Sequence, residues 1–210
     1  DSCPVADEVI NKAVSRLSKV LSSIGDPGYP LEKIYLSSDG EKAYITLLPR
    51  FKSAPASLGA LARHLKRHEE TGNVSLPGGD EAEFELSLSG LRFVTAPSVF
   101  TQSNIPVNEA LIGTVLVLAG LKGTETVLDL YSGAGNFSIP LAMSSKRVIS
   151  VEVNKKSAAL AKKSAALNGL NNIPFHVAPC EEYLRDEDPD AQSPDIVVLD
   201  PPREGAKGAV

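Results

Sequence analysis

The sequence is poor in the residues that stabilise small secreted proteins, and it lacks long apolar segments. Its 210 residues include two cysteines, one methionine and no tryptophan. Two cysteines, Cys3 and Cys180, cannot form a disulfide framework, so a reducing compartment is expected. The longest apolar run, Ala110–Leu118, is shorter than the ~20 residues that a membrane-spanning helix needs. We therefore expect a cytoplasmic protein with no membrane partner.

The sequence also has no excess of basic residues, because it contains 21 Lys and Arg against 26 Asp and Glu, and its net charge is −5. A total charge of this sign does not by itself indicate a nucleic-acid partner, although a local basic patch can serve one. Basic side chains gather at Arg50, Lys52, Arg63, His64, Lys66, Arg67 and His68. They are either a solvated face or a patch that neutralises RNA phosphates.

The first part of the chain has the pattern of a small α+β domain over residues 1–96. Apolar spacing and turn signals predict helices over 5–24 and Pro55–Glu70, and hairpins of Ile34–Ser37 with Ala43–Leu48 and Glu83–Leu88 with Leu91–Thr95. Since this order is hairpin, helix, hairpin, we expect no βαβ unit in this domain.

Strands alternate with helices over the second part, residues 97–210. The predicted helices are Asn104–Ala119, Asn136–Met143 and Lys155–Asn168, and the predicted strands are Thr126–Leu130, Arg147–Val151, Ile173–Val177 and Asp195–Leu199. Such alternation is typical of an α/β fold with a parallel sheet covered on both faces.

A glycine turn, Ser132-Gly133-Ala-Gly135, follows the first of these strands and precedes a helix. Ligands of open α/β sheets bind at the carboxyl ends of the strands, and glycine lets the backbone approach a ligand closely. Asp129 lies in the strand before the turn, and Glu152 ends the next strand, where an acid can accept both hydroxyls of a ribose. Ser138 replaces the third glycine of a dinucleotide fingerprint, which disfavours NAD. The alternative is a tight turn without a ligand.

A second candidate site is Asp200-Pro-Pro-Arg203, which follows an apolar strand. The prolines fix φ and remove two N–H donors, so the loop is stiff. A stiff loop suits a group that holds a flat substrate in one orientation. The alternative is an ordinary turn at the end of a strand.

Taken together, these segments resemble the RNA 5-methyluridine methyltransferase family. The matching stretches are Phe100-Thr-Gln-Ser-Asn104, Asn108-Glu-Ala-Leu111, Val127–Phe137, Val151-Glu152, Asn168-Gly169 and Val198–Gly205. They cover residues 97–205 in the family's order. The resemblance implies a class I (Rossmann-like) methyltransferase sheet that binds S-adenosylmethionine and acts on ribosomal or transfer RNA.

The resemblance also implies roles for single residues. Gln102, Asp129, Tyr131, Gly133, Gly135, Asn136, Glu152 and Asp200 match positions around the cofactor. Tyr131 would pack near the cofactor, Glu152 would hold its ribose, and Asn136 would bind its methionine end. Asp200 would face the target uracil, and Arg203 would contact either RNA phosphate or the base.

In the family a cysteine thiolate adds to C6 of uracil, C5 takes the methyl group and a glutamate base removes the C5 proton. The target base leaves its stack to be reached. That cysteine lies in a Ser-Cys-Asn/Asp-Pro segment, which these 210 residues lack. We therefore expect a sheet that is incomplete at its C-terminal end, no catalytic residue within this chain, and no turnover by this chain alone.

Both cysteines stand outside that motif. Cys3-Pro4 resembles the segment that supplies the last thiolate of a [4Fe-4S] cluster in the ribosomal-RNA branch of the family. Such clusters need about four thiolates, so Cys3 is either a cluster ligand that lacks its partners here or an incidental cysteine.

Pro179 stands where many class I enzymes carry an acid or Asn that touches adenine, so backbone or apolar contacts are expected there. Cys180 is expected to be a small packing residue.

Three rival functions stay open at this point. An adenine-N6 methyltransferase has an aromatic residue after Asp/Asn-Pro-Pro, and a cytosine-C5 methyltransferase has a cysteine after the two prolines. Arg203 occupies that position here and disfavours both. A non-catalytic RNA-binding module that retains a cofactor pocket is the third rival.

Overall fold

A computed structural model describes residues 6–24, 31–50, 56–76, 81–185, 193–203 and 205–206. The chain forms two compact units, one of Asp1–Leu86 with Thr95–Ile105 and one of Ser87–Val94 with Pro106–Val210. The chain passes between them after Leu86, after Val94 and after Ile105. The predicted division into domains after residue 96 stays a prediction.

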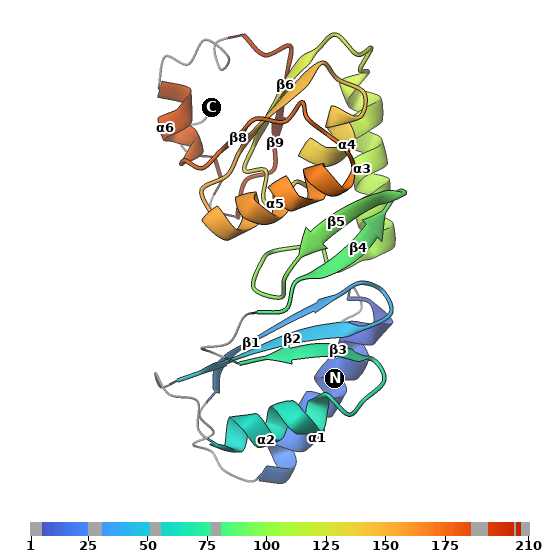
Figure 1. The fold of residues 1–210 in the computed structure, drawn as a ribbon, viewed down its shortest axis with the longest axis vertical. Coiled ribbons are helices and arrows are strands. Elements are labelled where there is room, and N and C mark those ends of the chain that lie inside the picture. Colours follow the sequence, from blue (N-terminus) through green and yellow to red (C-terminus); the bar gives the residue numbers. More distant parts are fainter. Residues whose placement is uncertain are drawn as a thin grey trace. The chain divides into compact units, whose positions relative to one another are not determined.

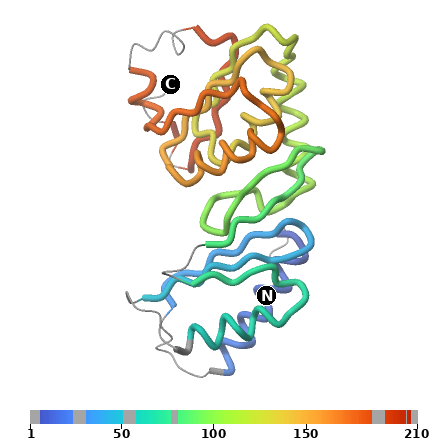
Figure 2. Tube along the Cα trace, viewed as in Figure 1, coloured from blue at the N-terminus to red at the C-terminus, as the bar shows by residue number. Residues whose placement is uncertain are grey.

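The first unit is a three-stranded sheet with two helices (Figures 1 and 2). Its elements are α1 (Glu8–Ile24), β1 (Leu31–Ser38), β2 (Ala43–Pro49), α2 (Ala56–Leu65) and β3 (Thr71–Ser75), and the strand order is β1-β2-β3. β1 and β2 form the predicted antiparallel hairpin. Both helices contribute to one core with the middle strand, made of Leu17, Ile45, Leu47, Leu58, Leu61, Ala62, Leu65 and Val74.

The prediction that this region has no βαβ unit is wrong. β3 pairs parallel to β2, so β2, α2 and β3 form one. The helix predicted to reach Glu70 ends at Leu65, and the carbonyl of Glu70 already accepts the N–H of Ala43 at 2.6 Å. The sequence Thr-Gly-Asn-Val-Ser has little β propensity. Its Gly72 is needed because a Cβ there would lie 2.7 Å from Cζ of Tyr44.

β4 (Phe84–Leu88) and β5 (Leu91–Thr95) form a separate two-stranded sheet, which confirms the second predicted hairpin. Ser89 and Gly90 both adopt positive φ, at 51° and 80°, as a tight two-residue hairpin turn requires. The end of helix α5 (Lys155–Leu167) is tied to this hairpin. Asn168 accepts the N–H of Arg92 at 3.0 Å and donates to its carbonyl at 2.6 Å.

The second unit contains the predicted parallel sheet. Its elements are α3 (Ile105–Ala119), β6 (Thr126–Leu130), α4 (Ser138–Ala142), β7 (Arg147–Val151), α5, β8 (Phe175–His176), α6 (Cys180–Arg185) and β9 (Ile196–Leu199). The sheet order is β8-β7-β6-β9, and all three pairings are parallel. The order reverses between β6 and β9, and a crevice for ligands is expected at such a switch point.

Burial follows this topology. After Thr126 and Arg147, the remaining residues of β6 and β7 are buried, as expected for strands covered on both faces. β9 alternates between half-buried and exposed residues, with Val197 48% and Leu199 41% exposed. The prediction of cover on both faces therefore fits the central strands and does not fit β9.

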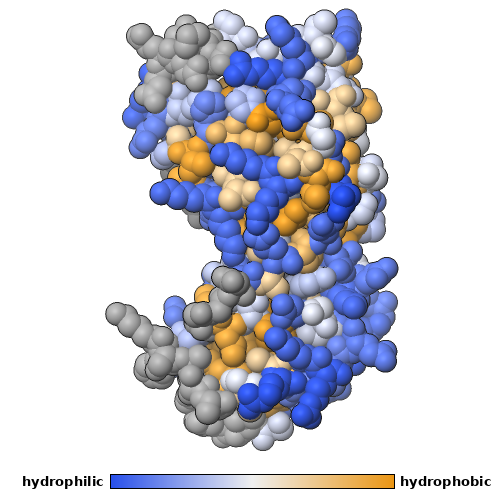
Figure 3. Space-filling model, in the orientation of Figure 1, coloured by the Kyte–Doolittle hydropathy of each residue, from blue (hydrophilic) through white to orange (hydrophobic). Residues whose placement is uncertain are grey.

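On the face drawn in Figure 3, apolar patches on each unit are broken up by hydrophilic side chains. Within the described ranges, none of the helices combines the length and the apolar character that crossing a bilayer requires.

Candidate cofactor site

The turn after β6 is built from residues with left-handed backbone conformations. Tyr131, Gly133 and Gly135 have φ angles of 60°, 57° and 91°. The turn is closed by the N–H of Gly135, which donates to the carbonyl of Ser132 at 2.9 Å. Ser132 donates its own N–H to the carbonyl of Val151 at 3.1 Å, so the turn is also tied to the end of β7.

The two glycines of the turn are needed for different reasons. A Cβ on Gly135 would lie 3.1 Å from Cγ1 of Ile139 and 3.3 Å from Cβ of Ala161, so this glycine lets the turn pack on α4 and α5. A Cβ on Gly133 would meet nothing within 4 Å. Gly133 therefore faces open space, and its positive φ rather than packing favours glycine there.

Glu152 lies directly after β7 and joins two loops. One carboxylate oxygen accepts the N–H of Gly133 at 2.8 Å, and the other accepts the N–H of Asn154 at 2.7 Å. Asn154 in turn caps α5 by accepting the N–H groups of Lys156 and Ser157. These bonds fix the position of the carboxylate, and each oxygen keeps a lone pair for a further donor.

Asp129 is fully buried in β6, with none of its surface exposed. Its Oδ2 accepts the hydroxyl of Ser138 at 2.5 Å. Its Oδ1 is buried and has no partner in the described structure, although buried polar atoms are almost always hydrogen-bonded. Burial raises the pKa of Asp129 to about 7, against the opposing effect of the Ser138 hydroxyl, and the negative charge of Asp200 adds to the rise. An unpartnered buried acceptor is what a ligand with a donor group would complement.

Asp200 follows β9 directly and is exposed. Because β9 pairs parallel with β6, Asp200 lies at the same edge of the sheet as the glycine turn. Arg203 is also exposed and lies in a turn that the N–H of Gly205 closes by donating to the carbonyl of Pro202 at 2.8 Å. The two residues predicted for the substrate therefore lie at the carboxyl edge of the sheet and are accessible.

Asn136 is held by a residue to which the sequence assigned no role. Its side-chain amide exchanges two hydrogen bonds with that of Asn108 on α3, at 2.8 and 3.0 Å. Asn108 is only 4% exposed. The pair fixes the amide of Asn136 beside the turn. That Asn136 binds the methionine end of a cofactor stays a prediction.

Tyr131 is clamped by the first turn of α6, an element that the sequence did not predict. Its N–H donates to Sγ of Cys180 at 3.3 Å, and its hydroxyl donates to Glu181 at 2.8 Å. Burial, and then this bond to Glu181, raise the pKa of Tyr131 to about 12.

Cys180 is 2% exposed, and burial raises its pKa to about 11, which agrees with its predicted packing role. The carbonyl of Pro179 accepts two N–H groups of α6 and is thereby occupied.

The roles of two further residues, Gln102 and Cys3, stay predictions. Gln102 belongs to the first unit, where it lines a cavity of about 20 Å³ with Ser37 and Thr101, room for about one water molecule. Cys3 lies outside the described residues, so its link to an iron–sulfur cluster stays a prediction. The described part of the chain holds no group of three or more His, Cys, Asp or Glu that suits a metal ion.

The sequence matches the family model of tRNA (uracil-5-)-methyltransferases over residues 83–207, more than half of the chain. The chain belongs to this family. A 23S rRNA uracil-C5 methyltransferase (RlmD) of Shewanella amazonensis is 32% identical over 98% of this chain, and one of Alkalilimnicola ehrlichii is 30% identical over 98%. The chain spans about half the length of these relatives, 48% of each.

Solved structures share the fold of this chain. The tRNA (uracil-54, C5)-methyltransferase of Pyrococcus abyssi, determined with S-adenosyl-L-homocysteine, matches 100% of this chain and 55% of its own with a TM-score of 0.66 and 20% identity. A tRNA m1G37 methyltransferase of M. jannaschii matches 78% of this chain and 52% of its own, with a TM-score of 0.51 and 16% identity. The predicted class I methyltransferase fold is confirmed.

Proposed function

We propose that this chain forms the S-adenosylmethionine-binding part of an enzyme that methylates uracil at C5 in RNA. The observation that carries the proposal is the pair of carboxylates at the carboxyl edge of the sheet. Oδ1 of Asp129 is buried without a partner, and Glu152 is held in place by Gly133 and Asn154. Both lie in the part of the chain that the family model matches.

The residues of the site complement the polar groups of this cofactor. The ammonium group of the methionine moiety would give Oδ1 of Asp129 the donor that it lacks, with the amide of Asn136 beside it. The free lone pairs of Glu152 would accept the two ribose hydroxyls. Tyr131 would form a wall of the site, whereas a role for Gln102 rests on the resemblance alone. When bound, S-adenosylmethionine supplies an electrophilic methyl group.

Asp200 and Arg203 would face the RNA. Both are exposed at the edge of the sheet, and the two prolines between them keep the loop stiff. A carboxylate can accept the N3–H of uracil, whereas cytosine offers no N–H at that position. Arg203 would contact phosphate or the base. The substrate RNA would be ribosomal or transfer RNA, as it is for the relatives named above.

The covalent adduct at C6 of uracil remains a proposal that rests on the resemblance. The described residues contain one cysteine, Cys180. It is buried, and its pKa is raised to about 11, so at neutral pH it is a thiol rather than the thiolate that attacks. Its burial and raised pKa make Cys180 a poor nucleophile.

Calorimetry with S-adenosylhomocysteine tests the cofactor site. We expect Glu152→Ala to weaken binding at least about tenfold, because charge-assisted bonds to hydroxyls are lost. Glu182→Ala, which removes an exposed carboxylate from α6, is the matched control and should bind normally. A folded chain that binds no S-adenosylhomocysteine, or binds it equally well after Glu152→Ala, would contradict the proposal.

Methyl transfer by the full-length protein tests the reaction. RNA is incubated with methyl-labelled S-adenosylmethionine and then digested to nucleosides. We expect the label in 5-methyluridine. Label in N6-methyladenosine or 5-methylcytidine would favour one of the two rival enzymes, and an absence of label would favour a non-catalytic module.

A further inference from the structure

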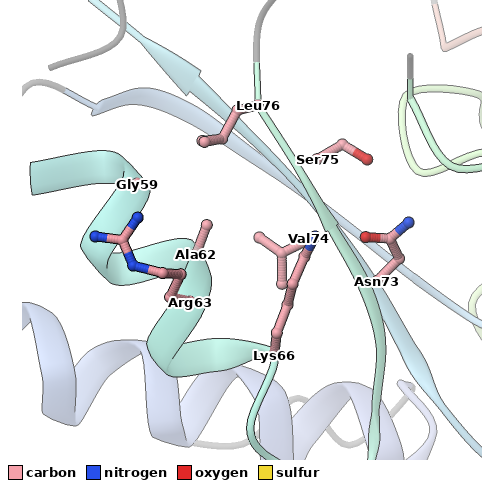
Figure 4. Close-up of a pocket in the computed structure, with 8 residues that line it drawn as sticks. All are labelled: Gly59, Ala62, Arg63, Lys66, Asn73, Val74, Ser75 and Leu76. Atoms are coloured by element: carbon pink, nitrogen blue, oxygen red, sulfur yellow. The ribbon is translucent and has the colours of Figure 1, made fainter. Parts of the chain in front are cut away.

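The first unit contains a cavity of about 380 Å³ between α2 and β3, separate from the residues of the cofactor site (Figure 4). Its volume lies in the range of small-molecule sites. It is lined by Gly59, Ala62, Arg63, Lys66, Asn73, Val74, Ser75 and Leu76. No acidic residue is among these.

Two cations border the cavity. Arg63 lies in the last turn of α2, Lys66 directly follows the helix, where its N–H donates to the carbonyl of Ala62 at 3.0 Å, and both side chains are exposed. Neither forms an ion pair within the described part of the chain. A favourable interaction with the C-terminal end of α2 accounts for one cation there. It does not account for a cavity that both cations flank.

The opposite wall is the edge of a sheet. β3 is the last strand in the order β1-β2-β3, so the main-chain groups on its outer side face away from β2. Val74 and Leu76 point toward α2, whereas Asn73 and Ser75 point to the other side of the strand (Figure 4). Asn73 and Ser75 therefore line the cavity with their main chain, and Val74 and Leu76 with Ala62 give it an apolar floor.

We propose that this cavity binds a phosphodiester group of the RNA substrate, with the adjoining ribose over the apolar floor. Arg63 and Lys66 would neutralise the phosphate, and main-chain N–H groups at the edge of β3 would donate to its oxygens, as backbone N–H groups do to phosphates in protein–DNA complexes. This inference rests on the proposed function, because it takes RNA to be the substrate.

The geometry favours a phosphate over an acidic peptide strand. A peptide that extends the sheet needs a long, open strand edge, and β3 has only five residues. Two cations that flank a compact cavity suit a single anionic group better than the alternating side chains of a strand. Gly59 lines the cavity, and a Cβ there would meet only the guanidinium of Arg63, at 3.4 Å, so a larger side chain can be introduced at this position.

Fluorescence anisotropy with a short labelled oligouridylate tests the inference on the 210-residue chain. We expect Arg63→Gln/Lys66→Gln to bind about tenfold more weakly at low salt. The slope of log K against log[salt] should also fall by about 0.7 for each phosphate that the variant no longer neutralises. Gly59→Met fills the cavity without a change of charge, and methionine favours a helix, so it should weaken binding in a chain that still folds.

A matched control removes two cations away from the cavity. Lys19→Gln/Lys42→Gln changes the net charge equally, at exposed positions that do not line it, and should bind the oligouridylate almost as well as the unmodified chain. Equal losses in both double variants would show a diffuse charge effect and overturn the proposal. So would unchanged binding in the cavity variants, or better binding of an extended acidic peptide than of RNA.

Failure of this inference is distinguishable from failure of the proposed function. Each variant is also titrated with S-adenosylhomocysteine, whose proposed site uses none of the altered residues. A chain that binds S-adenosylhomocysteine but no oligouridylate overturns the phosphate site alone. Loss of S-adenosylhomocysteine binding by Glu152→Ala remains the separate test of the cofactor site.

Discussion

Asn108 and Asn136 join helix α3 to the glycine turn through their side-chain amides. Each amide donates to the other, at 2.8 and 3.0 Å, and Asn108 is almost fully buried. Reciprocal bonds of this kind leave neither amide free to rotate. The turn that borders the proposed cofactor site is thus positioned by a helix that lies before β6 in the chain.

Removal of both amides should cost less than the sum of the two single removals. Asn108→Ala removes both bonds to the half-buried Asn136, and a lost hydrogen bond costs about 0.5–1.5 kcal/mol. We expect Asn108→Ala to lower the free energy of unfolding by that amount and to weaken S-adenosylhomocysteine binding. The double variant Asn108→Ala/Asn136→Ala should be less destabilised than the sum of the single variants, as denaturant unfolding would measure. Additive losses would show that the pair is not coupled.

Asp129 should make the stability of the chain depend on pH. Its pKa is 3.8 in an exposed reference state and about 7 in the folded chain. Between these values the unfolded chain loses its proton while the folded chain keeps it, so folding stability falls as pH rises. The loss reaches roughly 4 kcal/mol above pH 7, since each pH unit contributes about 1.4 kcal/mol.

Asp129→Asn cannot ionise and retains an acceptor for Ser138. Its melting temperature should therefore exceed that of the unmodified chain at pH 8, and the difference should shrink toward pH 4. Thermal unfolding across this range, without cofactor, measures it, with Glu182→Gln as the control for the loss of one exposed carboxylate. A difference that stays constant with pH would show that Asp129 is not the group responsible.

The sequence was informative where a side chain's role follows from its place at the end of a strand. β6 and β7 have the predicted bounds, and the turn after β6 meets Glu152 after β7, because parallel neighbours end at the same edge. Asn108 was not assigned a role, since an amide on a helix carries no local sign that it pairs with another 28 residues away.

β3 and α6 could not be predicted for related reasons. β3 has a sequence that disfavours strands and forms because the ring of Tyr44 packs over Gly72 and β2 supplies main-chain partners. α6 has six residues, too few for a clear helical period. In both cases contacts distant in sequence decide the local structure, so local propensity and spacing give no signal.

The hydrogen bond from the Tyr131 hydroxyl to Glu181 should stabilise the turn that carries Tyr131. Tyr131 is a non-glycine residue at φ 60°, a conformation that costs about 1–2 kcal/mol, and its bond to Glu181 helps to offset that cost. Tyr131→Phe and Glu181→Ala should each lower the free energy of unfolding by a small amount, because each removes the same hydrogen bond. The double variant should lose no more than either one, and denaturant unfolding would show this. Additive losses in the double variant would show that the two side chains do not stabilise the turn through one shared hydrogen bond.

The two glycines of the turn offer a matched test of packing against ligand contact. Gly135→Ala places a Cβ 3.1 Å from Ile139 and 3.3 Å from Ala161 at φ 91°, so we expect a loss of roughly 1–3 kcal/mol in folding stability. Gly133→Ala meets no neighbouring atom and should cost about 1 kcal/mol for its left-handed backbone alone.

Gly135→Ala should cause the larger loss of folding stability, whereas Gly133→Ala should cause the larger loss of cofactor affinity. The methyl group at position 133 would enter the open space beside Glu152, where the proposed cofactor lies. Gly133→Ala should therefore weaken S-adenosylhomocysteine binding by more than its small effect on stability explains, whereas Gly135→Ala should act mainly by unfolding the chain. Calorimetry well below the melting temperature of each variant separates these effects. Normal binding by Gly133→Ala would place the cofactor away from the turn, because a ligand that touches this backbone has no room for the added methyl group.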